Sequence, residues 1–148
     1  MLTLSEDEFL CGATHADPWY FPSFRDYLDD IDQVPAPGSV TPIPGHPDYA
    51  LARSSDSALL LCRGADDLHL VGYYNFPGAV CIHATHQGKG LGAELILHAA
   101  LVRGGPPSEG LDEQTFSEAG LRAHRAAWRL GVARGLIRDP GRVVAPSV

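Results

Sequence analysis

Three alternating glycines, Gly88, Gly90 and Gly92, stand between a short apolar stretch at Val80–His83 and a segment with helical periodicity. Glycine lets the backbone approach a ligand closely and adopt a positive φ without steric cost. The first amides of a helix have no partner within the helix, and they lie at the positive end of its dipole. A helix that starts directly after this loop would therefore offer several N–H donors to an anion. The spacing predicts a strand–loop–helix unit that holds the phosphates of a nucleotide-like ligand.

Two phosphate-binding motifs can be compared with this loop. A P-loop requires Ser or Thr after its lysine, but Gly90 follows Lys89, so that motif does not match. The Rossmann pattern G-x-G-x-x-G/A does match at Gly88–Ala93, although the loop comes late in the chain and no second βαβ unit follows it. A tight strand-to-helix turn without a ligand is the remaining alternative.

The segment Gln87-Gly88-Lys89-Gly90-Leu91-Gly92 resembles the Q/R-x-x-G-x-G/A signature of the GNAT superfamily of N-acetyltransferases. The resemblance implies an α+β sandwich, in which a mixed, mostly antiparallel sheet with flanking helices forms a V-shaped cofactor cleft. It implies acetyl-CoA or another acyl-CoA as the cofactor, with the loop on the diphosphate and the preceding strand on the pantetheine. The cofactor-binding residues that it implies are Cys81, Ile82, His83, Gln87, Gly88, Lys89, Gly90, Leu91, Gly92 and Ala93.

The activity implied by this resemblance is acyl transfer to an amine of a small molecule or a protein, which needs a base for the amine and an acid for the leaving thiolate. His83 is the first candidate for the base, and Cys81 as an acyl-carrying nucleophile is an alternative. The family's acid is a tyrosine on the last helix, and Gly131 takes that place here. Tyr73 or Tyr74 on a strand, or His124 on the last helix, could replace it. The second hypothesis for the function is a catalytically degenerate acyl-CoA-binding or protein-interaction module. No metal site is expected, because His83-x-x-His86 lacks further spaced ligands.

The elements that must position these residues follow from apolar periodicity. Ser5 and Glu8 form a capping box at the start of a first helix, and Glu94 is expected to stabilise the N-terminus of the helix after the loop. Val34–Asp48 is rich in proline and glycine, which predicts a long loop that could act as a lid. Other predicted elements are a helix at Phe24–Ile31, an antiparallel meander of strands at Tyr49–Arg53, Ser57–Arg63, Leu68–Phe76 and Val80–His83, a weak strand at Leu111–Phe116, and a last helix from a Ser117 cap to Leu136.

The whole chain has 148 residues and a net charge of −7, which predicts a single domain over residues 1–148 and no nucleic-acid partner. No apolar run is long enough for a membrane span, and the acidic N-terminus is too polar for a signal peptide. Three widely spaced cysteines favour a cytoplasmic location. A homodimer is expected because the chain is too short to complete the sheet edge and to cover its aromatic side chains, Trp19, Tyr20, Phe21 and Trp128.

Overall fold

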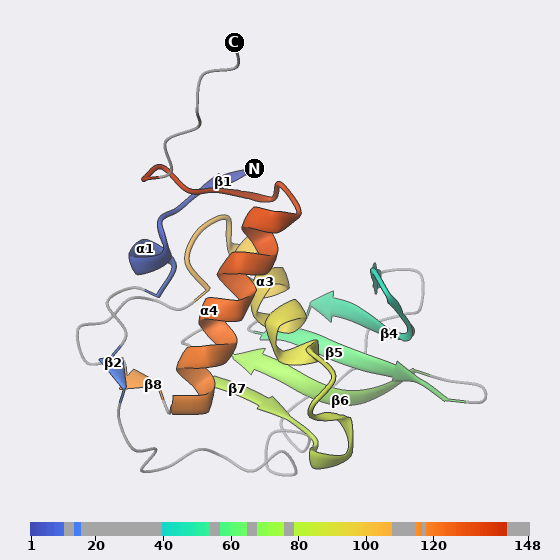
Figure 1. The fold of residues 1–148 in the computed structure, drawn as a ribbon. Helices are drawn as coiled ribbons and strands as arrows, with labels where there is room; N and C mark the ends of the chain where they lie inside the picture. The colour runs from blue at the N-terminus through green and yellow to red at the C-terminus, as the bar shows by residue number, and fades with distance from the viewer. Residues whose placement is uncertain are drawn as a thin grey trace.

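The computed structural model describes residues 1–10, 14–15, 40–53, 57–64, 68–75, 79–107, 115–116 and 118–141 (Figure 1). Most of the strands are consecutive in the middle of the chain, and the two long helices come after them. In chain order the elements are β1 (Leu2–Thr3), α1 (Glu6–Leu10), β2 (Thr14–His15), β3 (Thr41–Ile43), β4 (His46–Arg53), β5 (Ser57–Arg63), β6 (Leu68–Asn75), β7 (Ala79–Ile82), the 3-10 turn η2 (Ala84–His86), α3 (Leu91–Arg103), β8 (Thr115–Phe116), α4 (Glu118–Ala133) and β9 (Ile137–Arg138).

The main sheet has the order β3-β4-β5-β6-β7, and every neighbouring pair is antiparallel. Consecutive apolar residues, such as Ala58 to Leu61 of β5, give these strands two buried faces, since successive side chains point to opposite sides of a strand. The expected meander is therefore confirmed, and the chain belongs to the α+β class. β7 is the last strand of this sheet, and it leads directly into the glycine loop.

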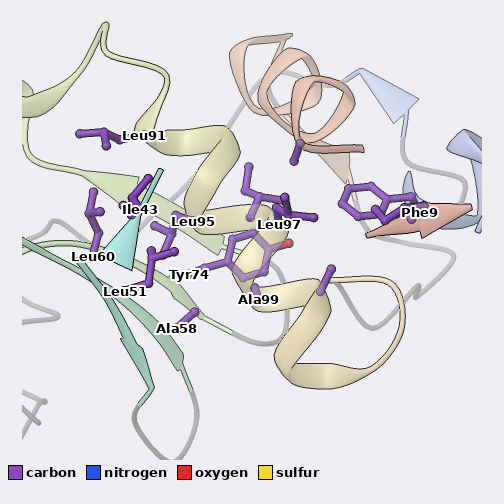
Figure 2. Close-up of a cluster of buried hydrophobic side chains, with 14 of the residues drawn as sticks. Phe9, Ile43, Leu51, Ala58, Leu60, Tyr74, Leu91, Leu95, Leu97 and Ala99 are labelled. Carbon is purple, nitrogen blue, oxygen red and sulfur yellow. The ribbon is translucent and has the colours of Figure 1, made fainter. Parts of the chain in front are cut away.

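The larger part of the core lies between the sheet and α3 (Figure 2). Leu91 and Leu95 of α3 face Leu51, Leu60 and Tyr74 of the sheet. α3 is apolar on nearly all sides because α4 packs on its outer face, so that α3 lies between the sheet and α4 (Figure 1). This packing fixes the N-terminus of α3, and with it the glycine loop, relative to β7.

A second, smaller apolar cluster lies on the opposite face of the sheet. It consists of Ala52, Leu59, Leu61 and Tyr73, which are at most 2% exposed. Leu59 and Leu61 alternate along β5 with Ala58 and Leu60 of the larger cluster. The face on which a strand residue lies therefore decides which of the two clusters it joins.

The N-terminus and the end of α4 are joined by backbone and side-chain contacts. β1 pairs with β9 in parallel, and the Trp128 indole donates a hydrogen bond to the Leu4 carbonyl at 2.9 Å. The predicted capping box of α1 is confirmed, because Ser5 Oγ accepts from the Glu8 amide and Glu8 Oε1 accepts from the Ser5 amide, both at 3.1 Å. Within the described ranges, no helix combines the length and apolar character that a membrane span requires.

Two expectations are corrected by the structure. Val34–Asp48 was expected to be a loop, yet its described part forms the β3–β4 hairpin, with Gly45 turning at φ 79°. Pro42 is compatible with β3 because β3 is an edge strand, where a missing amide hydrogen costs no ladder bond. In the weak strand Leu111–Phe116, the described residues Thr115 and Phe116 pair with β2 rather than with β7. The predicted helix Phe24–Ile31, the aromatic residues 19–21 and the Ser117 cap lie outside the described residues.

Candidate functional site

The glycine loop is an exposed turn that ends at the N-terminus of α3. Gly88 and Gly90 both adopt the left-handed conformation, with φ of 80° and 78°, and residues 87–90 are exposed. Gly90 is the N-cap of α3, and no described side chain caps the first amides of the helix. The Gln87 side chain donates a hydrogen bond to the Ile82 carbonyl at 2.8 Å, which ties the loop to the end of β7. The first turn of α3 is therefore held in place, and no side chain of the described residues caps its amides, which an anion could bind.

Gly92 differs from the other two glycines of the loop. Its φ lies outside the left-handed region, and a Cβ atom there would meet Ile82 Cδ1 at 3.6 Å, which is an ordinary van der Waals contact. The fold therefore needs glycine at positions 88 and 90 for their backbone conformation, but it does not need glycine at position 92. If Gly92 has a function, that function is to let a ligand approach the helix.

Four aromatic or imidazole rings and one lysine lie around the loop. The hydroxyl of Tyr49, on β4, is 2.8 Å from Nδ1 of His86, on η2. Lys89 Nζ lies 6.0 Å from the centroid of the Tyr49 ring, and the rings of His46 and His83 are edge-on to Tyr49 and His86, respectively. The turn after β7 thus meets a side chain from β4, three strands away in the sheet, and brings His86 and the cationic Lys89 close to the helix N-terminus.

The protonation of His86 follows from this environment. Partial burial, and then the nearby His83 and Lys89, lower the pKa of His86 below its ordinary value. The ring is therefore neutral near pH 7, and its Nδ1 can accept the hydrogen of the Tyr49 hydroxyl. The charges that lower this pKa are the same charges that would favour a bound anion.

His83, the predicted base, is exposed but not freely available at Nδ1. This nitrogen is 2.8 Å from Thr85 Oγ1, and it accepts a longer bond of 3.4 Å from the Thr85 amide. Because a backbone N–H can only donate, Nδ1 of the neutral ring is unprotonated and the hydrogen is on Nε2. In this arrangement neither nitrogen can accept a substrate proton without a rearrangement of the turn.

His124, a candidate acid, is fully buried between α4 and the sheet. Its Nδ1 is 2.7 Å from the Gly120 carbonyl, which can only accept, so the hydrogen is on Nδ1. Nε2 then accepts from the Tyr74 hydroxyl at 2.8 Å. Burial lowers the pKa of His124 to about 4, and the Gly120 carbonyl only partly opposes this shift. The structure does not agree with the predicted imidazolium acid, because the ring is neutral at pH 7 and is shielded from any substrate.

The two candidate tyrosines of β6, Tyr73 and Tyr74, do not reach the loop either. Tyr73 belongs to the apolar cluster on the face away from α3 and is 1% exposed, while Tyr74 is buried against His124. Gly131, where the family's tyrosine was expected, lies in the packing between α4, α3 and β9. A Cβ atom there would come within 2.9 Å of Leu97 Cδ1 and even closer to Ile137. A large side chain at position 131 therefore does not fit.

The remaining predicted cofactor residues occupy the end of β7 and the start of α3. Val80 and Ile82 pack against the larger core cluster, and the backbone of Cys81 pairs with Tyr73. No described strand lies beside β7 on its outer side, so the described residues do not form the expected V-shaped cleft. Leu91 is buried, and Ala93 is partly buried.

Glu94 was expected to stabilise the helix dipole, but it also makes a buried ion pair. Its carboxylate accepts two bonds from Arg134, at 2.5 and 2.7 Å, and Glu94 is only 6% exposed. This contact joins the start of α3 to the residue after α4, and the hydrogen bond to Glu94 raises the pKa of Arg134. The pair holds the helix N-terminus in position, and it engages both carboxylate oxygens of Glu94 in a buried contact.

Sequence reasoning missed Tyr49 as a neighbour of the loop. Tyr49 was expected only as a strand residue, and nothing in its local pattern indicates that its hydroxyl meets a turn nearly forty residues later. No group of three or more His, Cys, Asp or Glu side chains suited to a metal ion occurs among the described residues. This finding applies to the histidines around Tyr49 as well.

Comparisons with known proteins give no relative for this chain. No family model matches it, and no curated protein and no solved structure is significantly similar to it. The likeness to GNAT proteins thus depends on the loop signature and on the order of the neighbouring elements.

Proposed function

We propose that this chain binds acyl-CoA through the glycine loop between β7 and α3. The observation that carries the proposal is the N-terminus of α3, which follows two left-handed glycines and has no side-chain cap from a described residue. Backbone amides at such a position bind phosphate oxygens without a charged side chain. A loop whose glycines serve only a turn would not need a third glycine at position 92, where the backbone accepts other residues.

The side chains around the loop fit a phosphorylated ligand. Lys89 offers a mobile ammonium, and neutral His86 that accepts from Tyr49 at Nδ1 keeps a donor hydrogen at Nε2. Gln87 is engaged with the Ile82 carbonyl, so we assign it to positioning the loop rather than to a phosphate contact. Coenzyme A supplies the thioester chemistry when it is bound, and these residues would hold its diphosphate.

Acyl transfer to an amine of a small molecule or a protein is the second candidate function. The observation that favours it is the Tyr49 hydroxyl bonded to His86, which places a proton donor and acceptor next to the loop. Binding alone is the better supported proposal, because His124 and Tyr73 are buried and Nδ1 of His83 is engaged by Thr85. Release of free thiol from acetyl-CoA over a panel of amines tests this second function.

Isothermal titration calorimetry with coenzyme A tests the binding proposal. Gly90→Val should reduce the affinity at least about tenfold, because the side chain strains a left-handed residue and occupies the space above the helix amides. Gly104→Val is the matched control, since Gly104 is the C-cap of the same helix with φ 73° and also has open space around it. It carries the same kind of strain at the opposite end and should bind like the wild-type chain.

A second variant distinguishes loss of a ligand contact from distortion of the loop. Gly92→Val changes a position whose backbone is not left-handed, so it should weaken coenzyme A binding at least about tenfold while the loop keeps its conformation. Equal affinity in the wild-type chain and in both Gly90→Val and Gly92→Val would refute the proposal. No measurable binding by the wild-type chain would refute it as well.

A further inference from the structure

Charge is unevenly distributed along this acidic chain. Residues 118–141 contain five arginines and two acidic residues, which gives this segment a net charge of +3, whereas the remainder carries −10. Most of these arginines belong to α4. The last helix is therefore a basic element on an otherwise acidic protein.

Three arginines form a row on the outer face of α4. Arg122, Arg125 and Arg129 follow the i, i+3, i+7 spacing that keeps residues on one side of a helix, and all three are exposed. The row extends over about 10 Å, at 1.5 Å per residue. Ala126 is exposed next to them and is too small to cover the guanidinium groups. We call this row the arginine face.

An acidic element lies directly beside the arginine face. α1 packs against α4 (Figure 1), and its first turn consists of Glu6, Asp7 and Glu8. Arg125 Nε is 3.3 Å from Glu6 Oε1, so the acidic turn and the arginine face are in contact within one protomer. Asp7 and Glu8 are exposed. One surface of the molecule thus carries a positive strip and a negative strip side by side.

We propose that this surface is the interface of a symmetric homodimer. A two-fold axis between the strips places the arginine face of each protomer on the acidic turn of its partner, so that the same contact forms twice. Such an isologous interface requires a surface that is complementary to itself, and adjacent strips of opposite charge meet this requirement. The occupant of the arginine face is therefore a second copy of this chain.

The net charge of −7 does not prevent this association at physiological salt. Charges further apart than a Debye length, about 8 Å, are largely screened, so the repulsion between the two molecules as a whole is weak. Arginine–carboxylate pairs in contact are screened less at this ionic strength, and their forked geometry favours carboxylate partners. Exposed ion pairs nevertheless weaken as the salt concentration rises further, so the dimer should dissociate at high salt.

Sedimentation velocity over a concentration series tests the proposal, with two charge-reversed chains as the probes. The first chain carries Arg122→Glu and Arg129→Glu, which leave the Arg125–Glu6 pair intact. The second carries Asp7→Lys and Glu8→Gln, which make the turn positive apart from the Arg125–Glu6 pair, and glutamine at position 8 can keep the capping box with Ser5. Far-UV circular dichroism should show that both chains are folded. We expect the wild-type chain to dimerise at low salt and to dissociate at about 0.5 M NaCl, where the Debye length is only a few ångströms.

The decisive result comes from mixing the two variants. Each alone should be monomeric, because like charges would face each other across the two-fold axis. Together they should form a heterodimer, since the reversed α4 of one chain meets the reversed α1 of the other. A wild-type chain that stays monomeric at low salt, or variants that dimerise alone, would overturn the proposal. Binding of poly-glutamate by a chain that stays monomeric would assign the arginine face to an acidic partner and would also overturn it.

Discussion

His124 should make the stability of the protein depend on pH. Its ring is fully buried, and burial lowers its pKa to about 4 in the folded chain, against about 6.5 in an unfolded chain. Between these two values the unfolded state binds the proton and the folded state does not, so stability falls as the pH falls. The contribution of His124 is complete above pH 6.5 and is lost as the pH approaches 4. A difference of about 2.5 pKa units corresponds to about 3 kcal/mol.

Urea unfolding at several pH values measures this effect. The free energy of unfolding of the wild-type chain should fall by up to about 1.4 kcal/mol for each pH unit from this one group. Burial also lowers the pKa of His98, and carboxylates titrate in the same range, so the comparison must be made between variants. His124→Gln is the test variant, because glutamine offers a donor for Gly120 and an acceptor for Tyr74 but takes up no proton.

Tyr74→Phe is the control for the lost hydrogen bond. It should destabilise the protein by about 1–3 kcal/mol, because it removes the buried hydroxyl that donates to Nε2 of His124. It keeps the buried imidazole, however, and should therefore keep the pH dependence. If the wild-type chain and His124→Gln lose equal amounts of stability between pH 6.5 and 4, His124 is not a buried group that is neutral in the folded state.

Two further predictions concern α4 and the loop. Gly131→Ala should lower the free energy of unfolding by about 1 kcal/mol in urea, because the overpacking cost of about 1–3 kcal/mol exceeds the helix-propensity gain of about 1 kcal/mol; an increase in stability would contradict the packing at this site. Coenzyme A binding should be accompanied by proton uptake, because a bound phosphate offsets the neighbouring charges that lower the pKa of His86. Affinity should consequently rise from about pH 8 to about pH 6 in the wild-type chain and rise less in His86→Gln, as calorimetry in buffers of different ionisation enthalpy would show; an identical pH dependence in the two chains would exclude His86 from the site.

The strands of the sheet could be predicted because the apolar runs and turn signals that specify them lie within a few residues of each other in the sequence. Ser57–Arg63 and Leu68–Asn75 are short, largely apolar runs between turn signals, and the structure places both strands where the pattern indicates. The hairpin at Thr41–Arg53 could not be predicted in this way. Its prolines are typical of a loop, and only the edge position of β3 makes Pro42 compatible with a strand.

The candidate site was predicted in part. Gly88 and Gly90 have the left-handed conformations that their loop requires, and these follow from residue type and spacing. The contact between Tyr49 and His86 joins two segments distant in sequence, so no local pattern contains it. The burial of His124 did leave a signal, because Leu121, His124, Ala127 and Trp128 share one face of a helix. This periodicity predicts that His124 lies in the core rather than at a reaction centre.

The central claim, that the glycine loop binds acyl-CoA, is tested most directly by a ¹⁵N–¹H NMR titration of the chain with coenzyme A. The amides of residues 88–93 should show the largest chemical-shift changes, because the loop and the first turn of α3 would donate to the diphosphate. The amides at the opposite end of the helix, around Gly104, should change little. An unchanged spectrum, or changes centred away from residues 88–93, would contradict the claim.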